Sequence, residues 1–304
     1  MRFFVLLGAI CLTMVGLVVL AGGVVRATGA GMGCPDWPKC FGLWIPPTDA
    51  SQLPADYRIR FNVHGHGVEP FNVYKTWTEY LNRLLGAAAG LAVAGFALGG
   101  ALSDVSRRAK LLALAAVVLM AFQGWLGAKV VDSNLAPLMV TVHMVVALAI
   151  VLTLMTAIHA ARPFAPLDPV YFKHAAALTA LIFLQTALGT RVREAVDEQT
   201  FAGAERSTWI EGAGAWFYVH RSFSWLMLIH IAYLIWRFRK TGSVPRSLKT
   251  AAAVAAAVSI LGATMHYADV PVWAQPLHLL GAVLLASAIF YFLLQTVHVR
   301  HRNG

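Results

Sequence analysis

Two histidines lie at matching places in the two halves of this chain. His143 follows Gly127, and His278 follows Gly262, at the same interval of sixteen residues, and both histidines lie within apolar stretches. A histidine in a lipid-buried helix is energetically costly and is therefore a candidate functional residue. The matching positions indicate an internal repeat with one site in each half.

A second matched pair lies upstream in each half. Asn82 and Arg83 in the first half correspond to His220 and Arg221 in the second. Two histidines from different helices, facing one another in an apolar interior, are a natural axial pair for a haem iron, because imidazole suits iron. We predict that His220 and His278 ligate a haem; the alternative is a hydrogen-bonded pair of core histidines.

The two halves differ at this site. The first half has Asn82 in place of a second histidine, and Glu79 one helical turn earlier, where the second half has Phe217. A histidine pair suits an electron-transferring haem, whereas a single histidine, His143, leaves iron or a bound substrate more open. Glu79 is then expected to move protons or stabilise developing positive charge. The alternative is an ion pair between Glu79 and Arg83, one turn apart on the helix.

Two further arginines occupy matching positions. Arg26 and Arg193 each follow a valine and lie four residues after a glycine, at points where apolar stretches end. A guanidinium matches the planar geometry of a carboxylate. These arginines are candidates to bind carboxylates such as porphyrin propionates; alternatively, they extend to the lipid interface.

Two cysteines, Cys34 and Cys40, frame the segment CPDWPKC after the first apolar stretch. An oxidising outer compartment permits a disulfide between them, and we predict that disulfide, in either a structural or a redox role. Zinc binding together with His64 and His66 is the alternative, although only two cysteines lie close by. Cys11 lies within an apolar stretch and is expected to be a buried small residue.

The elements that must position these residues are membrane-spanning helices. Of the 304 residues, 59% are hydrophobic and 12% are charged, and apolar stretches near the about 20 residues needed to cross a bilayer recur. They predict an all-α integral membrane protein of eight transmembrane helices, arranged as two pseudo-symmetric four-helix bundles. The predicted spans are residues 3–25, 77–102, 109–129, 138–160, 171–190, 214–236, 248–265 and 273–297.

The repeat predicts two domains, residues 1–165, which include a long outer loop 26–76, and residues 166–304. Basic residues flanking the spans concentrate on one side, which predicts that both termini are cytoplasmic and that the repeated histidines lie toward the outer side. The net charge of +10 is then mostly a consequence of topology, and no nucleic-acid binding is expected.

Six segments distributed over nearly the whole chain are together specific, although none is specific alone. They are GGVVRATGAGMGCPDWPKC, EYLNRLLG, GWLGAKVVDSNLAPLMVTVH, LGTRVR, HRSFSW and LGATMHYADVPVWAQPLH. In these segments, in their order and at eight-helix spacing, the chain resembles the haem A synthase family of the cytochrome oxidase assembly pathway.

The resemblance implies an oxidoreductase that converts the C8 methyl group of haem O to a formyl group, giving haem A. It implies a haem b on His220 and His278, and haem O as substrate in the first half, with His143 as its iron ligand. It also implies a catalytic role for Glu79 and a disulfide or redox role for the two loop cysteines.

Asn82 departs from the pattern of many family members, which have histidine at this position. We therefore expect haem O to bind through His143 alone, with Asn82 forming a hydrogen bond near the iron. The matched arginines complete the expected cofactor-binding set: Arg26, Arg83, Arg193 and Arg221.

The expected location is a bacterial cytoplasmic membrane, with membrane lipid around the helices. Haem O synthase, cytochrome oxidase assembly factors and further copies of the chain are candidate partners, whereas the sequence does not identify the electron acceptor. The alternatives are a b-type haem electron carrier without haem-modifying activity and a transporter built from parallel repeats. Glu79 and the difference between the halves favour the enzyme, and polar residues near helix ends rather than the midplane disfavour the transporter.

Overall fold

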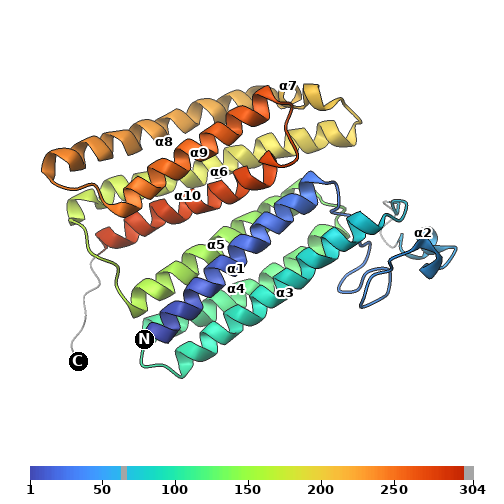
Figure 1. Ribbon diagram of the computed structural model, residues 1–304, viewed down its shortest axis with the longest axis horizontal. Helices are drawn as coiled ribbons and strands as arrows, with labels where there is room; N and C mark the ends of the chain where they lie inside the picture. Colours follow the sequence, from blue (N-terminus) through green and yellow to red (C-terminus); the bar gives the residue numbers. More distant parts are fainter. Residues whose placement is uncertain (63–66, 298–304) are drawn as a thin grey trace. The chain divides into compact units, whose positions relative to one another are not determined.

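The computed structural model describes residues 1–62 and 67–297, and long helices dominate these residues (Figure 1). Short helical segments lie in the connections: α2 (Tyr57–Arg60), α7 (Trp209–Gly212) and three 3-10 turns. The long helices are α1 (Arg2–Ala27), α3 (Val73–Ala101), α4 (Arg107–Asp132), α5 (Pro137–Ala161), α6 (Phe172–Phe201), α8 (Gly214–Thr241), α9 (Arg246–Tyr267) and α10 (Ala274–Thr296).

The protein is a multi-pass membrane protein. Among the described residues, seven helices are long and apolar enough to cross a bilayer: α1, α3, α4, α5, α6 with the preceding turn, α9 and α10. The remaining long helix, α8, is of similar length but carries polar and charged side chains such as His220, Arg221 and Arg237, which lower its hydropathy. The expected all-α membrane architecture is therefore confirmed, with seven candidate spans.

Helix α6 extends past the predicted end of its span at residue 190 and continues to Phe201. Arg191 donates to Glu194 at 2.7 Å, and Arg193 donates to Asp197 at 2.8 Å. Such pairs, three or four residues apart, stabilise a helix that has left the apolar region. The polarity that ends an apolar stretch in the sequence therefore does not end the helix.

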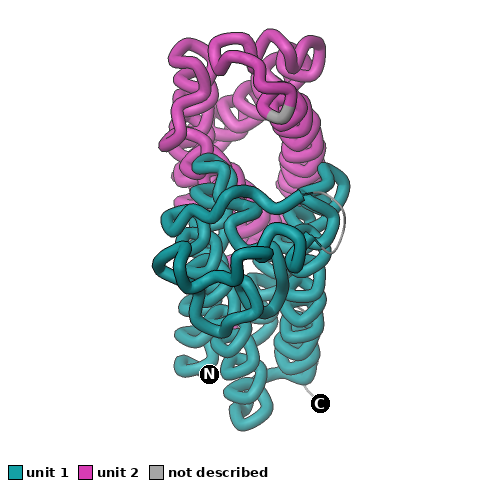
Figure 2. Tube along the Cα trace, turned by 90° about the vertical axis from the view of Figure 1, so that its right-hand side faces the viewer, with its two compact units in different colours: residues 1–161 teal, residues 162–304 magenta. Residues whose placement is uncertain are grey.

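The chain divides into two compact units, Met1–Ala161 and Arg162–Gly304 (Figure 2). In the first unit, α1 and α4 each pack against both α3 and α5. In the second unit, α6 and α9 each pack against both α8 and α10. Each unit is thus a ring of four helices in the same order along the chain. The second and fourth helices, α3 and α5 or α8 and α10, lie across each ring from one another.

The loop between α1 and α3 forms a small core of its own. Phe41 lies at its centre, with the rings of Tyr57, Phe61 and Phe71 each within 5.8 Å of its ring. Both carboxylate oxygens of Asp36 accept hydrogen bonds from the main chain, one from Phe41 and one from the following glycine. These contacts hold the loop in a defined shape beside the beginning of α3.

Candidate functional site

Glu79 lies in a polar network between α3 and the loop. Helix α3 begins at Val73 because the side chain of Asn72 caps it, accepting from two main-chain N–H groups. Glu79 is 4% exposed. Its Oε2 accepts a hydrogen bond from the main-chain nitrogen of Cys34 at 2.8 Å, and its Oε1 forms an ion pair with Arg83. Both oxygens of this buried carboxylate therefore have a partner, one in the loop and one on α3.

Arg83 fastens the loop to α3. Its Nη1 donates to the main-chain oxygens of Asp36 and Lys39 at 2.6 and 3.0 Å, and its Nη2 donates to that of Cys34 at 3.0 Å. The Nε and Nη2 groups also donate to Glu79. All five N–H donors of this guanidinium have acceptors within the protein. The ion pair considered as an alternative for Glu79 is thus present, and Arg83 has no free donor for a ligand.

Cys34 and Cys40 form a disulfide, as the sequence predicts. The neighbouring main chain approaches α3 closely: Thr76 donates to the oxygen of Gly33 at 2.8 Å, and a Cβ on Gly33 would lie 2.5 Å from the main chain of Lys75. The disulfide makes the two cysteines unavailable as zinc thiolates. His64 and His66, the other residues of the zinc alternative, lie outside the described residues.

The site residues of the first unit lie on helices that face each other across the ring. Asn82 is on α3 and His143 is on α5, and neither Oδ1 of Asn82 nor Nδ1 of His143 has a hydrogen-bond partner within residues 1–62 and 67–297, although both atoms are buried. Gln123 on α4 donates to the main-chain oxygen of His143 at 3.1 Å. Buried polar atoms without partners are uncommon and require an explanation, and a bound polar group or metal is one.

His220 and His278 face each other across the second unit, from α8 and α10. Their ring centres are 6.5 Å apart, and no hydrogen bond joins them in the described part of the chain. By contrast, His174 and His230, whose ring nitrogens are 3.2 Å apart, have ring centres 5.4 Å apart. Imidazoles on opposite sides of one metal, with each nitrogen about 2 Å from it, have ring centres roughly 6 Å apart. The spacing of His220 and His278 therefore suits a shared metal.

The surroundings of these two rings orient them. Nδ1 of His278 lies 3.1 Å from the main-chain oxygen of Val258, which makes Nδ1 the protonated nitrogen and leaves Nε2 as the metal-binding one. Gln185 donates to the main-chain oxygen of His220 at 3.0 Å, and Nδ1 of His220 is buried without a partner among the described residues.

Glycines make room for the histidine rings. A Cβ on Gly189 would lie 3.1 Å from Cε1 of His220, and one on Gly262 would lie 3.3 Å from Cε1 of His278. In the first unit the equivalent distance, from Gly127 to His143, is 3.7 Å. The repeated glycine therefore lies directly against the repeated histidine in both units, as the equal intervals in the sequence suggest.

The remaining arginines lie on three different helices. Arg193 forms ion pairs with Asp197 and Glu194, and Arg26 lies in the last turn of α1. The guanidinium of Arg221 lies over the rings of Phe217 and Tyr218, so its contacts differ from those of Arg83, its match in the first unit.

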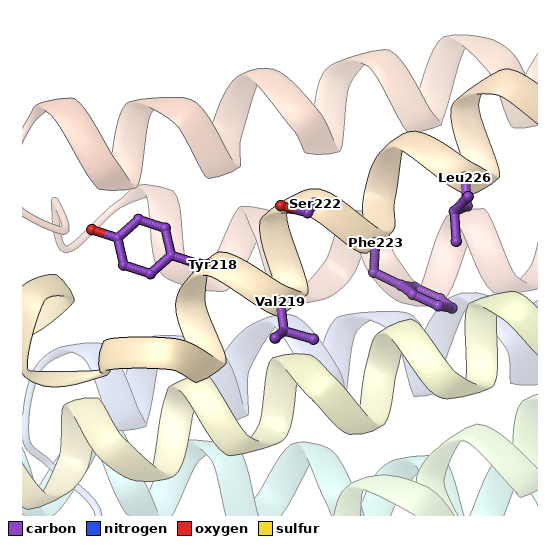
Figure 3. Close-up of a pocket in the computed structure, with 5 residues that line it drawn as sticks. All are labelled: Tyr218, Val219, Ser222, Phe223 and Leu226. Carbon is purple, nitrogen blue, oxygen red and sulfur yellow. The ribbon is translucent and has the colours of Figure 1, made fainter.

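An open, mostly apolar hollow lies along α8 (Figure 3). It is lined by Tyr218, Val219, Ser222, Phe223 and Leu226. None of these is a predicted site residue, and no charged side chain lines the hollow.

Gln123 and Gln185 donate to the main-chain oxygens of His143 and His220, but neither the repeat nor a motif marks them in the sequence. A glutamine inside an apolar span is the signal that could have found them. The pair His174 and His230, on α6 and α8, is likewise not marked by the repeat.

Comparison with known proteins supports a single family. The family model COX15-CtaA, described as cytochrome oxidase assembly protein, matches residues 5–290. A heme A synthase of Shewanella oneidensis is 34% identical over 128 residues, covering 42% of this chain and 36% of that protein. Those of Methylorubrum extorquens (strain PA1) and Azorhizobium caulinodans are 27% and 28% identical, covering 96% and 90% of this chain and 84% and 88% of theirs.

Proposed function

Because the chain belongs to the COX15-CtaA family of cytochrome oxidase assembly proteins, we propose that it is a haem A synthase, an oxidoreductase that converts haem O to haem A. The match of the family model to residues 5–290 is the observation that carries this proposal. Relatives that align with at least 90% of the chain and bear this name support it.

The finer architecture is part of the proposal. We propose that α8 is an eighth span, because it packs between α6 and α9 within a ring of otherwise apolar helices. The two rings are then pseudo-symmetric bundles, one for each domain of the repeat. From the basic residues flanking the spans, we propose that both termini lie in the cytoplasm of a bacterial cell and that the repeated histidines lie toward the outer side.

We propose that His220 and His278 hold a haem b in the second unit. The spacing of the rings, the orientation of His278 by Val258 and the glycines against both rings support this assignment. When bound, haem b supplies one-electron redox chemistry. The protein contributes two imidazoles from facing helices and an apolar surround that excludes water.

The first unit is the proposed substrate site. His143 is the candidate ligand for the iron of haem O, and Asn82, from the facing helix, is the candidate for a hydrogen bond beside that iron. Their buried atoms without partners in the described part of the chain support these roles. A single histidine would leave the bound substrate more open than a histidine pair.

Glu79 is the proposed proton acceptor. Conversion of a methyl group to a formyl group adds one oxygen atom and is a four-electron oxidation; when water supplies the oxygen, four protons are released and the electrons pass to an acceptor, so the site needs a group that takes up protons. Oε1 and Oε2 of Glu79 lie one helical turn from Asn82 on α3, and the loop covers them from outside. Arg83 and the disulfide between Cys34 and Cys40 act in this scheme by positioning the loop and the carboxylate.

Three arginines remain candidates for the haem carboxylates. Arg26 and Arg193 end the apolar part of the first helix in each unit, and Arg221 follows His220. Arg193 forms an ion pair with Asp197 at 2.8 Å. To bind a haem propionate, it would exchange the carboxylate of Asp197 for that of the propionate. Candidate protein partners remain haem O synthase, assembly factors and further copies of the chain.

The test is extraction of haem from the purified protein, followed by chromatography with mass detection, after expression with and without a haem O synthase. We expect haem b alone without the synthase, and haem b together with haem O and haem A when it is present. Haem b alone in both cases would instead identify a b-type electron carrier. A protein without any haem would contradict both assignments.

A further inference from the structure

His266 lies beside the facing histidines of the second unit. It follows Gly262, which contacts the ring of His278, by one turn of α9. Its ring centre is 4.9 Å from that of Phe217, which precedes His220 by one turn of α8. His266 and Phe217 therefore cover the histidine pair on the side where α8 begins and α9 ends.

The imidazole of His266 is incompletely satisfied by the protein. Its Nδ1 is buried and has no hydrogen-bond partner among the residues that the structure describes. Its ring neighbours are Phe217, which offers no acceptor, and Tyr267, whose side chain is 83% exposed. Leaving such a nitrogen unpaired destabilises the protein. A group bound beside the histidine pair would relieve this cost.

The internal repeat places a polar group at the same level in both units. His266 corresponds to Val131 of the first unit, because each follows the repeated glycine by four residues, whereas Phe217 corresponds to Glu79. In the first unit the polar group is Glu79, on the second helix of the ring, α3. In the second unit it is His266, on the third helix, α9. Packing alone does not require the polar group to move from one helix to the next.

A second donor lies at the same level. Arg193 follows Gly189 by four residues on α6, and Gly189 contacts the ring of His220. Two donors, Arg193 and His266, are thus each one turn beyond a glycine that contacts a proposed iron ligand. A haem periphery is apolar except for its two carboxylates, so these are the groups that suit such donors.

We propose that His266 is a positioning residue that donates a hydrogen bond from Nδ1 to one carboxylate of the haem held by His220 and His278. The inference rests on the proposed haem b site of the second unit. This hydrogen bond would also orient the haem, because the haem carboxylates would then point toward the beginning of α8. Hydrogen bonds to charged groups contribute about 1.5–3 kcal/mol, so loss of this donor weakens haem b binding by about tenfold or more.

The experiment compares variants of the full-length protein, stripped of haem and titrated either with haem b or with its dimethyl ester, in which both carboxylates are blocked. His266→Leu keeps apolar contact with Phe217 but removes the donor, whereas His266→Asn keeps a donor near the position of Nδ1. His230→Leu is the matched control, because His230 pairs with His174 away from the site.

We expect His266→Leu to bind haem b about tenfold more weakly than wild type, and His266→Asn and His230→Leu to bind it within about twofold. With the dimethyl ester, the difference between wild type and His266→Leu should disappear. If His266→Leu does not fold, His266→Phe replaces it.

Three outcomes would overturn the proposal. If His266→Leu binds haem b as wild type does while His266→Asn binds it weakly, His266 serves only to pack against Phe217. A loss of affinity that persists with the ester would exclude the carboxylate as partner. Wild-type protein that binds no haem b would refute the second-unit site itself, and the inference with it.

Discussion

Glu79 is the residue whose contacts most constrain the chemistry of the first unit. Replacing it with alanine removes the proposed proton acceptor without touching the second unit, so we expect haem b to be retained and haem A formation to fall by about 10²–10⁴-fold. Glu79→Gln separates the role in holding the loop from the role in accepting a proton, because the amide oxygen still accepts a hydrogen bond from Cys34 but takes up no proton. Haem A per chain, quantified by chromatography, is the measurement. Normal haem A formation by purified Glu79→Ala protein would exclude the catalytic role.

Substitution of Asn82 tests whether the first unit binds its substrate through one histidine. Asn82→Leu removes the proposed hydrogen bond beside the iron and leaves His143 unchanged, so we expect turnover to fall about tenfold. Asn82→Gln, which retains an amide, is the control. Turnover of haem O by the leucine variant equal to that of wild type would show that Asn82 has no part in the reaction.

The sequence identifies individual residues of the site where the repeat or a short motif marks them. His143 and His278 can be found because each follows a glycine at the same interval, and His220 because it matches Asn82 of the first half. The acceptors of Arg83 cannot, because they are main-chain oxygens 44 to 49 residues earlier in the chain. The glutamines that hold His143 and His220 are not at matching positions, so the repeat gives no signal for them.

At the scale of elements, a single glycine allows α6 to lie against a histidine of α8. A Cβ at Gly189 would lie 3.1 Å from the ring of His220, closer than ordinary contact, whereas one at Gly127 would lie 3.7 Å from the ring of His143. Overpacking costs about 1–3 kcal/mol, so we expect Gly189→Ala to weaken haem b binding about tenfold and Gly127→Ala to leave it unchanged. Haem b titrations of both variants measure this, and equal affinities would contradict it.

Helix α8 decides the topology of the chain. If α8 crosses the membrane, the chain has eight spans and both ends are on the same side; if it does not, seven spans put them on opposite sides. We expect eight spans, so a fluorescent protein fused after Val297 should fluoresce and alkaline phosphatase at the same point should be inactive. The reverse result would remove α8 from the bilayer and would also contradict the proposed haem geometry.

The extent of the helices could be predicted from the sequence to different degrees. The predicted span at residues 138–160 is close to α5, Pro137–Ala161, because hydropathy and helix end together there. The span predicted at 171–190 underestimates α6, because ion pairs formed by Arg191 and Arg193 continue the helix beyond the apolar region. Hydropathy reports where a helix leaves lipid, and not where its hydrogen bonds end.

At the scale of the whole molecule, the two compact units differ in what they are proposed to hold. The proposed haem b site draws its ligands and the glycines against them from Arg162–Gly304 alone, on helices that form a closed ring. The proposed substrate site draws Glu79, Asn82 and His143 from Met1–Ala161. No residue of either proposed site comes from the other unit.

We therefore expect residues 162–304, expressed alone, to bind haem b and to form no haem A when haem O is supplied. Both proposed ligands, His220 and His278, lie on helices of this unit, and the carboxylate of Glu79 is absent from it. The ratio of haem b to protein should match that of the full-length chain, and the same fragment carrying His278→Ala should lose haem b. A folded fragment without haem b, beside a full-length protein that contains it, would show that the second unit binds its cofactor only in the intact chain.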